Sequence, residues 1–144
     1  MKLLRNNHGF TLTEMLIVIA LIALVGTFVT GQVIGKYNRA KVDATKIQMK
    51  NLGVVLDDYR RDCNKYPTTE QGLDALINKA SGGPECKNFD PDGYLKNKKI
   101  PKDGFGYEYA YESDGNKYVL KSLGADNKEG GADTDKDISS DDLE

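Results

Sequence analysis

The sequence predicts an α+β protein in which one long N-terminal helix packs against a small antiparallel β-sheet. Three observations support this fold class: an apolar run that begins at Phe10, an apolar stripe at helical spacing after it, and aromatic stretches on both sides of an Asp-Gly turn. The chain has 144 residues. About 110 of them follow the apolar run, which is enough for one compact domain.

The apolar run has the length of a membrane span. Between Phe10 and Ile34 the only charged side chain is Glu14. An α-helix rises about 1.5 Å per residue, so this run can cross roughly 30 Å of bilayer hydrocarbon. The leader, residues 1–9, carries a lysine, an arginine and no acid. We expect these cations to stay in the cytoplasm while the C-terminal part crosses the membrane.

Helical spacing continues beyond the apolar run. Apolar or uncharged side chains recur at steps of three and four, while most charged side chains fall on other positions. The stripe consists of Val42, Thr45, Met49, Leu52, Leu56 and Tyr59. It is too short to favour a coiled coil, so we predict a single helix from about Phe10 to Arg61 whose second half packs on a sheet.

Shorter elements follow the long helix. Pro67 cannot continue it, and residues 68–77, with a threonine cap and an acidic first turn, predict a short helix. Residues 107–111 and 118–123 alternate around an Asp-Gly turn and predict a β-hairpin. We expect the three tyrosines of its first strand to share one face and to pack on the helix stripe. Residues 139–144 are expected to be a frayed end.

The two cysteines, Cys63 and Cys86, are both predicted to lie outside the cytoplasm, where disulfides persist. A bond between them would close a loop around the short helix and stabilise the domain by about 3 kcal/mol. Two free thiols are the alternative.

An acidic stretch near the C-terminus is the candidate metal site. Residues 123–138 hold four aspartates and three glycines, but no histidine or cysteine. Carboxylates combined with backbone carbonyls favour a hard cation, and Ca²⁺ accepts six to eight oxygen ligands. An EF-hand is rejected because Ile138 stands where that motif needs glycine. The alternative is a solvated acidic segment that binds no metal.

Composition argues against several other functions. The net charge is −2, which gives no basic footprint for nucleic acid. The only histidine is His8, in the leader, so the rest of the chain has no imidazole for general-base or zinc chemistry. The sequence also lacks a P-loop and the common hydrolase motifs. We therefore predict that the protein is not an enzyme and does not bind nucleic acid.

The residues before the apolar run carry a family resemblance. Gly9-Phe10-Thr11-Leu12-Thr13-Glu14 precedes the run, and no small-residue cleavage site follows it. This arrangement resembles the class III signal of type IV pilins and their relatives. The resemblance implies that a prepilin peptidase cuts between Gly9 and Phe10, that Phe10 becomes N-methylated, and that the apolar helix is retained.

The same resemblance implies an assembly role for Glu14, which would pair with the Phe10 ammonium of a neighbouring subunit and set its register. An unpaired carboxylate in hydrocarbon is costly, so Glu14 must be paired, protonated or functional. A side chain that merely reaches the membrane interface is the alternative.

Further segments narrow the resemblance to one family. Tyr66-Pro67-Thr68-Thr69-Glu70-Gln71-Gly72-Leu73, Ile100-Pro101-Lys102-Asp103 and Leu123-Gly124-Ala125-Asp126 are similar to segments of the major pseudopilins (G-type subunits) of the bacterial type II secretion system. Phe105-Gly106 stands where relatives tend to have Trp-Gly. The resemblance implies a pilin-like fold and a calcium site closed by the end of the hairpin.

The family's ligand pattern can be placed on this chain. Asp126 matches the first acidic position, and Asp135 and Asp137 match a later Asp-x-Asp. The carbonyl of Leu123 is a candidate backbone ligand, and Asp133 sits where relatives vary.

The resemblance also implies a place in the cell. Residues 1–9 would be the leader, 10–35 a single span of the inner membrane and the core of a filament, and 36–144 a periplasmic domain. The partners would be other copies of the chain, prepilin peptidase, minor pseudopilins, the inner-membrane assembly platform and the lipid bilayer. The homopolymer would drive export of folded proteins across the outer membrane. A type IV pilin for adhesion or motility, and a membrane-anchored calcium-dependent envelope enzyme, are the alternatives.

Overall fold

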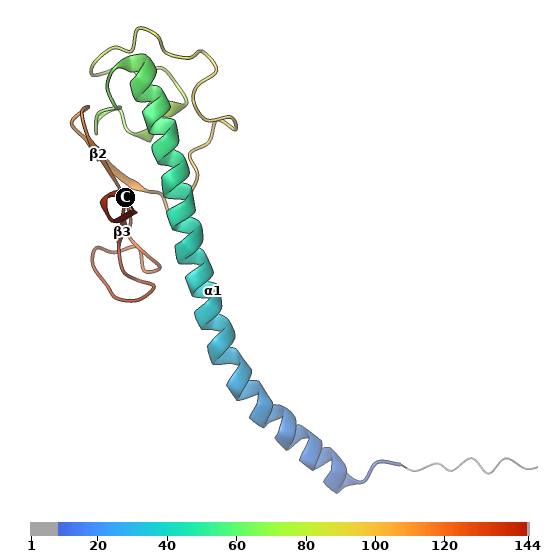
Figure 1. Ribbon diagram of the computed structural model, residues 1–144. Coiled ribbons are helices and arrows are strands. Elements are labelled where there is room, and N and C mark those ends of the chain that lie inside the picture. Colours follow the sequence, from blue (N-terminus) through green and yellow to red (C-terminus); the bar gives the residue numbers. More distant parts are fainter. Residues whose placement is uncertain (1–8, 144) are drawn as a thin grey trace, which may run out of the picture. The chain divides into compact units, whose positions relative to one another are not determined.

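The computed structural model describes residues 9–143, without the side chains of residues 27–33, and it confirms the predicted α+β class (Figure 1). The bounds of its elements are α1 Leu12–Cys63, η1 Leu73–Leu76, β1 Ala110–Ser113, β2 Tyr118–Ser122, β3 Ile138–Ser139 and η2 Ser140–Leu143, where η denotes a 3-10 helix. The chain divides after Tyr37 into two compact units, which we call unit 1 and unit 2. Of the predicted leader, only Gly9 lies within the described residues.

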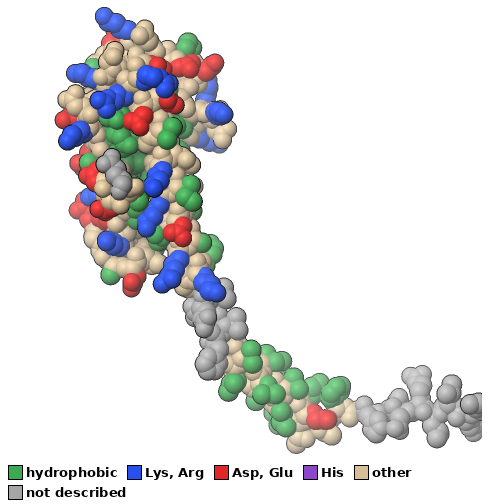
Figure 2. All heavy atoms as spheres, in the orientation of Figure 1, with side chains coloured by type: hydrophobic (Ala, Val, Ile, Leu, Met, Phe, Trp, Pro, Cys, Tyr) green, Lys and Arg blue, Asp and Glu red, His purple; other side chains and the backbone are tan. Residues whose placement is uncertain are grey.

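Unit 1 contains the N-terminal part of α1. Every described side chain from Gly9 to Gly26 is exposed, and most of them are apolar (Figure 2). Phe10 and Leu12 are each 78% exposed. Among the described residues, no helix combines the length and the hydropathy that a membrane span needs. The membrane span of residues 10–35 therefore stays a prediction.

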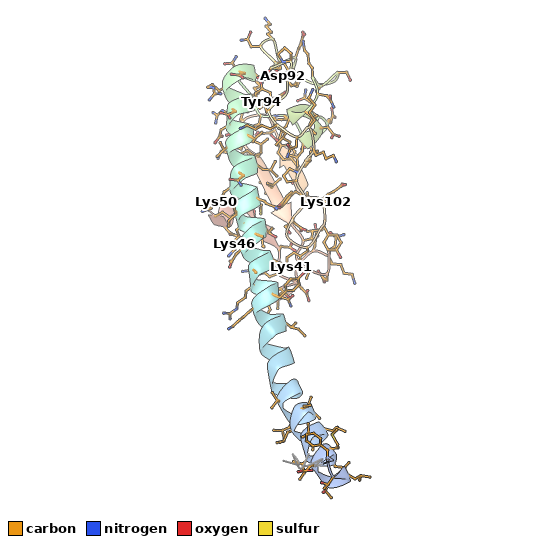
Figure 3. All side chains as sticks on the ribbon, turned by 90° about the vertical axis from the view of Figure 1, so that its right-hand side faces the viewer. Lys41, Lys46, Lys50, Asp92, Tyr94 and Lys102 are labelled. Carbon is orange, nitrogen blue, oxygen red and sulfur yellow. A yellow bond between two sulfur atoms is a disulfide. The ribbon has the colours of Figure 1, made fainter. Side chains whose placement is uncertain are left out.

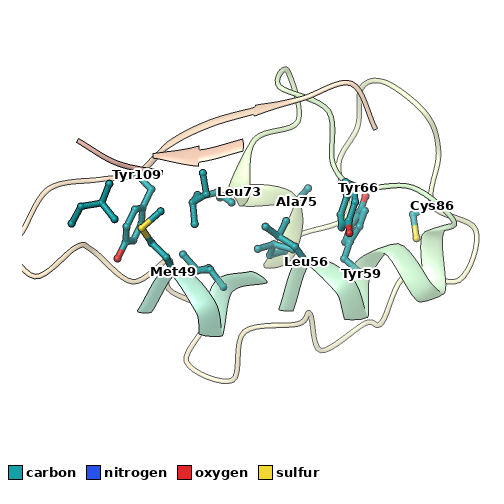
Figure 4. Close-up of a cluster of buried hydrophobic side chains, with 12 residues drawn as sticks. Met49, Leu56, Tyr59, Tyr66, Leu73, Ala75, Cys86 and Tyr109 are labelled. Atoms are coloured by element: carbon teal, nitrogen blue, oxygen red, sulfur yellow. The ribbon is translucent and has the colours of Figure 1, made fainter. Parts of the chain in front are cut away.

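The helix stripe is buried in unit 2, as predicted. Thr45 and Leu56 are fully buried, and Val42, at the start of the stripe, packs against the core while partly buried. Met49, Leu52 and Tyr59 are at most 3% exposed. The apolar side chains of the stripe meet residues from the loops and the sheet in one hydrophobic cluster (Figure 4). Burial of one face thus fixes how the amphipathic half of α1 contacts the rest of unit 2.

The end of α1 also lies close to its predicted position. The helix ends at Cys63, and the next residue, Asn64, has a φ of 62°. This left-handed conformation is typical of the residue that terminates a helix, and asparagine tolerates it better than most residues.

The sheet contains the predicted hairpin and one further strand. β1 pairs antiparallel with β2, from Ala110↔Lys121 to Ser113↔Tyr118. At the turn, the Asp114 carboxylate accepts hydrogen bonds of 2.8 Å from the backbone N–H groups of Asn116 and Lys117. β3 pairs with the other edge of β2, which gives the strand order β1-β2-β3.

The first strand starts later than predicted, and the shared tyrosine face is therefore wrong in part. Tyr109 is buried and Tyr111 half-buried, but Tyr107 is 37% exposed. The cause is Asp103, whose carboxylate accepts hydrogen bonds from the N–H groups of Phe105 (2.9 Å) and Tyr107 (2.8 Å). This side chain holds residues 103–107 in a turn, so they cannot extend the strand.

The short helix predicted for residues 68–77 is only the 3-10 helix η1. Thr68 and Gln71 bond reciprocally, each side chain to the other's backbone N–H, at 3.4 Å and 3.0 Å. This capping box begins a helical turn, but Gly72 then adopts a φ of 60° and ends it. The helix restarts at Leu73.

The C-terminal segment is ordered through Leu143, so the predicted frayed end is wrong for residues 139–143. Ile138 in β3 is buried, and Leu143 in η2 packs against the core. The Leu120 N–H donates to the Ser140 hydroxyl at 3.0 Å. The segment is held because it supplies both an apolar side chain and a hydrogen-bond acceptor to the sheet.

Candidate functional sites

The N-terminal motif forms a helix cap. Thr11 directly precedes α1, and its backbone N–H donates to Glu14 Oε2 at 2.8 Å. In return, the Glu14 N–H donates to Thr11 Oγ1 at 3.2 Å. The Thr11 hydroxyl also donates to Glu14 Oε2, at 3.0 Å. Glu14 thus satisfies N–H and O–H donors that would otherwise be unpaired at the start of the helix.

The capping role of Glu14 was missed in the sequence, although the signal is present there. Thr11-Leu12-Thr13-Glu14 has the spacing of a capping box, with threonine at the cap and glutamate three residues later. The carboxylate of Glu14 remains on the surface of the single chain, and Gly9 and Phe10, the residues of the predicted cleavage site, are exposed beside it in sequence. The motif therefore lies on the surface of the single chain.

The second candidate site is the loop between β2 and β3. Its two ends are joined where the Ala125 N–H donates to the Thr134 carbonyl at 3.0 Å. Gly124 has a φ of 68°, and a Cβ atom there would lie 2.6 Å from the backbone carbonyl of Asp135. Glycine is required at this position by both the backbone conformation and the close approach.

The far part of the loop folds back on the same residues. Gly131 also lies against the Asp135 carbonyl, with no room for a Cβ atom. The Gly130 N–H donates to Asp137 Oδ2 at 3.2 Å. Asp137 Oδ1 is buried and has no hydrogen-bond partner among the described residues. A buried carboxylate oxygen without a donor is costly, and a bound cation would satisfy it.

The other predicted ligands differ in their surroundings. Asp126 and Asp133 are exposed, and Asp126 Oδ1 accepts a hydrogen bond from the Lys128 N–H at 3.1 Å. Leu123 and Asp135 are half-buried. Within residues 9–143, no three acidic, histidine or cysteine side chains come together in a group that could hold a metal ion.

Cys63 and Cys86 form a disulfide, with 4.6 Å between their Cα atoms. The bond joins the end of α1 to the loop that follows η1. The Cys86 side chain belongs to the buried core, so the bond also fixes this loop against the helix (Figure 4).

The comparisons with known proteins give the family. The model of the family "Type II secretion system (T2SS), protein G" matches residues 32–141, and that of the "Prokaryotic N-terminal methylation motif" matches residues 4–30. This chain belongs to the protein G family of type II secretion systems. The match covers most of unit 2, including the stripe, the hairpin and the loop between β2 and β3, which we also call the acidic loop.

Individual relatives agree with the family. The chain is 43% identical to the type II secretion system core protein G of Pseudomonas aeruginosa over 136 residues, which cover 93% of this chain and 94% of that protein. It is 38% identical to core protein G of Vibrio cholerae, over 96% of this chain and 94% of that protein.

A solved structure agrees with the fold. The crystal structure of the major pseudopilin from the type 2 secretion system of enterohaemorrhagic Escherichia coli has a TM-score of 0.62 and 33% identity. The similarity covers 74% of this chain and 91% of that one. The long helix packed on a small antiparallel sheet is thus a fold that the family uses.

Proposed function

We propose that this chain is the major structural subunit of a pseudopilus, the periplasmic filament with which a type II secretion system drives folded proteins across the outer membrane. The observation that carries the proposal is the exposed apolar face of unit 1, which follows the N-terminal motif directly. An apolar surface of this extent needs either lipid or other protein around it. In a subunit that moves from the membrane into a filament, lipid covers this surface first and neighbouring subunits cover it afterwards.

Processing and assembly use the N-terminal motif. A prepilin peptidase cuts between Gly9 and Phe10, and Phe10 is then N-methylated. The new ammonium pairs with Glu14 of a neighbouring copy. The capping box does not prevent this pairing, because a carboxylate has acceptor positions beyond those that Thr11 occupies.

The location and the remaining partners follow from this role. Residues 10–35 span the inner membrane once, and residues 36–144 lie in the periplasm. Minor pseudopilins and an inner-membrane assembly platform act on the subunit, which itself carries no catalytic activity. ATP hydrolysis belongs to another protein, because this sequence has no nucleotide-binding motif.

We further propose that the loop between β2 and β3 binds Ca²⁺. The unpartnered oxygen of Asp137 supports this site, as do the close turns at Gly124 and Gly131. Asp126, Asp135 and Asp137 are the candidate carboxylate ligands, Leu123 offers its carbonyl, and Asp133 is a secondary candidate. The ion would join the two ends of the loop and so hold β3 on β2.

Deletion of the gene tests the function. A pseudopilin deletion leaves exoproteins folded in the periplasm, and a plasmid copy of the chain restores their release. Normal secretion combined with lost surface filaments or lost twitching would instead identify a type IV pilin. Rescue by a chain with a replaced N-terminal anchor would point to the membrane-anchored, calcium-dependent envelope enzyme.

A further inference from the structure

Basic side chains lie on two opposite sides of α1 where unit 2 begins. Arg39, Lys41 and Lys46, which we call the basic collar, lie within the first nine residues of this unit, and Asp43 is the only acid between residues 38 and 50. Successive helix residues are rotated by about 100°, so Arg39 and Lys46, seven residues apart, point to one side of the helix and Lys41 points to nearly the opposite side. In Figure 3, Lys41 and Lys46 are seen on opposite sides of α1.

A fixed loop adds aromatic side chains to the collar. The Gly104 N–H donates to Thr45 Oγ1 at 2.9 Å, and Gly104 lies directly against the carbonyl of Lys41. The next side chain, Phe105, is therefore held beside the helix, with its ring centroid 5.6 Å from Lys41 Nζ. Tyr107 follows and is 37% exposed. Aromatic rings next to cations are typical of surfaces at a membrane interface.

The chain keeps the collar near the bilayer if residues 10–35 span it, and to this extent the inference rests on the proposed function. Lys41 lies six residues beyond Gly35. Six residues reach at most about 20 Å when fully extended, and about 9 Å as a helix. Cations near a membrane span are normally concentrated on the cytoplasmic side, whereas the collar would lie on the opposite side. Topology alone therefore does not explain it.

We propose that the basic collar binds the anionic phospholipid headgroups of the membrane leaflet that faces unit 2. A flat membrane surface around the helix can meet cations on both of these opposite sides, whereas a protein partner docked on one side would meet only some of them. The attraction holds the domain of an unassembled subunit against the bilayer. Because the chain is already anchored, each contact can be weak and still be occupied.

Vesicle binding of unit 2 alone, residues 38–144, tests the proposal without the membrane helix. The fragment is appropriate because the hydrophobic core cluster of the described residues, from Met49 to Ile138, lies within it. At low salt we expect it to sediment with phosphatidylglycerol vesicles but not with phosphatidylcholine vesicles. The triple variant R39Q/K41Q/K46Q should bind roughly 100-fold more weakly, since each cation near an anionic surface contributes about fivefold. Binding of the wild type should fall as salt rises toward 0.15 M.

A matched variant separates the collar from charge in general. The variant K87Q/K98Q/K99Q makes the same change in net charge. Lys87 lies away from the collar, because it follows Cys86, which the disulfide joins to Cys63 at the C-terminal end of α1. We expect this control to bind like the wild type, and equal melting midpoints verify that both variants fold. Absence of binding to phosphatidylglycerol, or equal losses in the two variants, overturns the proposal. Because secretion is not measured, either result leaves the pseudopilin assignment unaffected.

Discussion

Glu14 has two sets of possible partners, and they make different demands on its side chain. Within one chain it accepts hydrogen bonds from the Thr11 N–H and hydroxyl. In a filament it would also face a neighbouring ammonium. A cap needs only an acceptor oxygen, which glutamine also provides, whereas pairing with an ammonium in a dry environment needs the negative charge.

Substitutions at Glu14 should therefore separate the two roles. We expect Glu14→Gln to keep the cap but to abolish filaments, and Glu14→Ala to lose both. Filament yield after overexpression, measured by electron microscopy, gives assembly, and membrane fractionation gives subunit levels. Normal filaments from Glu14→Gln together with few from Glu14→Ala would assign Glu14 to the cap alone.

Two glycines of the acidic loop differ in a way that tests its packing. Gly124 and Gly130 both have positive φ, 68° and 97°, but only Gly124 has a neighbour where a Cβ atom would lie. Gly130→Ala should cost about 1–2 kcal/mol for its backbone conformation alone. Gly124→Ala should cost more, by about 1–3 kcal/mol, because it also pushes the Asp135 carbonyl away. Urea unfolding of unit 2 measures both, and equal costs would contradict the close approach.

Among the secondary-structure elements, the sequence predicts best those whose buried side chains recur at a regular spacing. The stripe of α1 follows one period over five helical turns, and each of its residues packs in or against the core. Two other features depend instead on single residues. The Asp103 hydrogen bonds delay the start of β1, and the positive φ of Gly72 reduces the short helix to η1. Neither feature leaves a periodic pattern in the sequence. β3 is only two residues long, too short for alternation to appear.

The loop between β2 and β3 should respond to calcium as one element. With excess Ca²⁺ we expect the melting midpoint of unit 2 to rise by on the order of 10–30 °C relative to chelator. Binding at 100 to 1,000 times the dissociation constant contributes about 3–4 kcal/mol, and each kcal/mol shifts the midpoint by roughly 4–8 °C. Asp137→Asn should remove most of the shift, because it removes the charge of the carboxylate whose Oδ1 is buried without a hydrogen-bond partner among the described residues.

Asp92→Asn is the matched control for charge. It removes one exposed carboxylate outside the loop and should keep the full calcium shift. Identical midpoints with calcium and with chelator in the wild type would show that the loop is a solvated acidic segment.

The candidate sites were predictable to different degrees. The sequence indicated the acidic loop as a candidate metal site, because aspartates and glycines cluster in it. The sequence could not show which carboxylate turns inward, since that depends on how Gly124 and Gly131 fold the loop around Asp135. For the same reason, only the structure sets the buried oxygen of Asp137 apart from the exposed Asp126 and Asp133.

Across unit 2, tyrosines couple the fold to alkaline pH. Burial raises the pKa of Tyr94, beside the Asp62 carboxylate, and of Tyr111 to about 12, above the usual value of 10.0. Burial also raises the pKa of Tyr109. The neutral forms are favoured in the folded state, so their contribution to stability is complete below pH 10 and is lost as the pH rises toward 12.

We therefore expect the unfolding free energy of unit 2 to fall between pH 10 and pH 12. At pH 8 the double variant Tyr94→Phe/Tyr111→Phe should be less stable than the wild type, because it loses the hydrogen bonds of both hydroxyls. Its unfolding free energy should, however, fall less steeply with rising pH than that of the wild type. Urea titrations at several pH values measure both slopes. Parallel declines would mean that these two tyrosines do not cause the loss.

β3 and η2 lie at the very end of the chain, yet the core and the sheet depend on them. Ile138 fills a place in the core, and Ser140 satisfies the Leu120 N–H. A chain truncated before Ile138 would have no side chain to fill this place, and it would leave one edge of β2 open to pair with the edge of another chain. The last two elements thus serve as a cover for the hairpin, and their loss would turn a shielded strand into a site of aggregation.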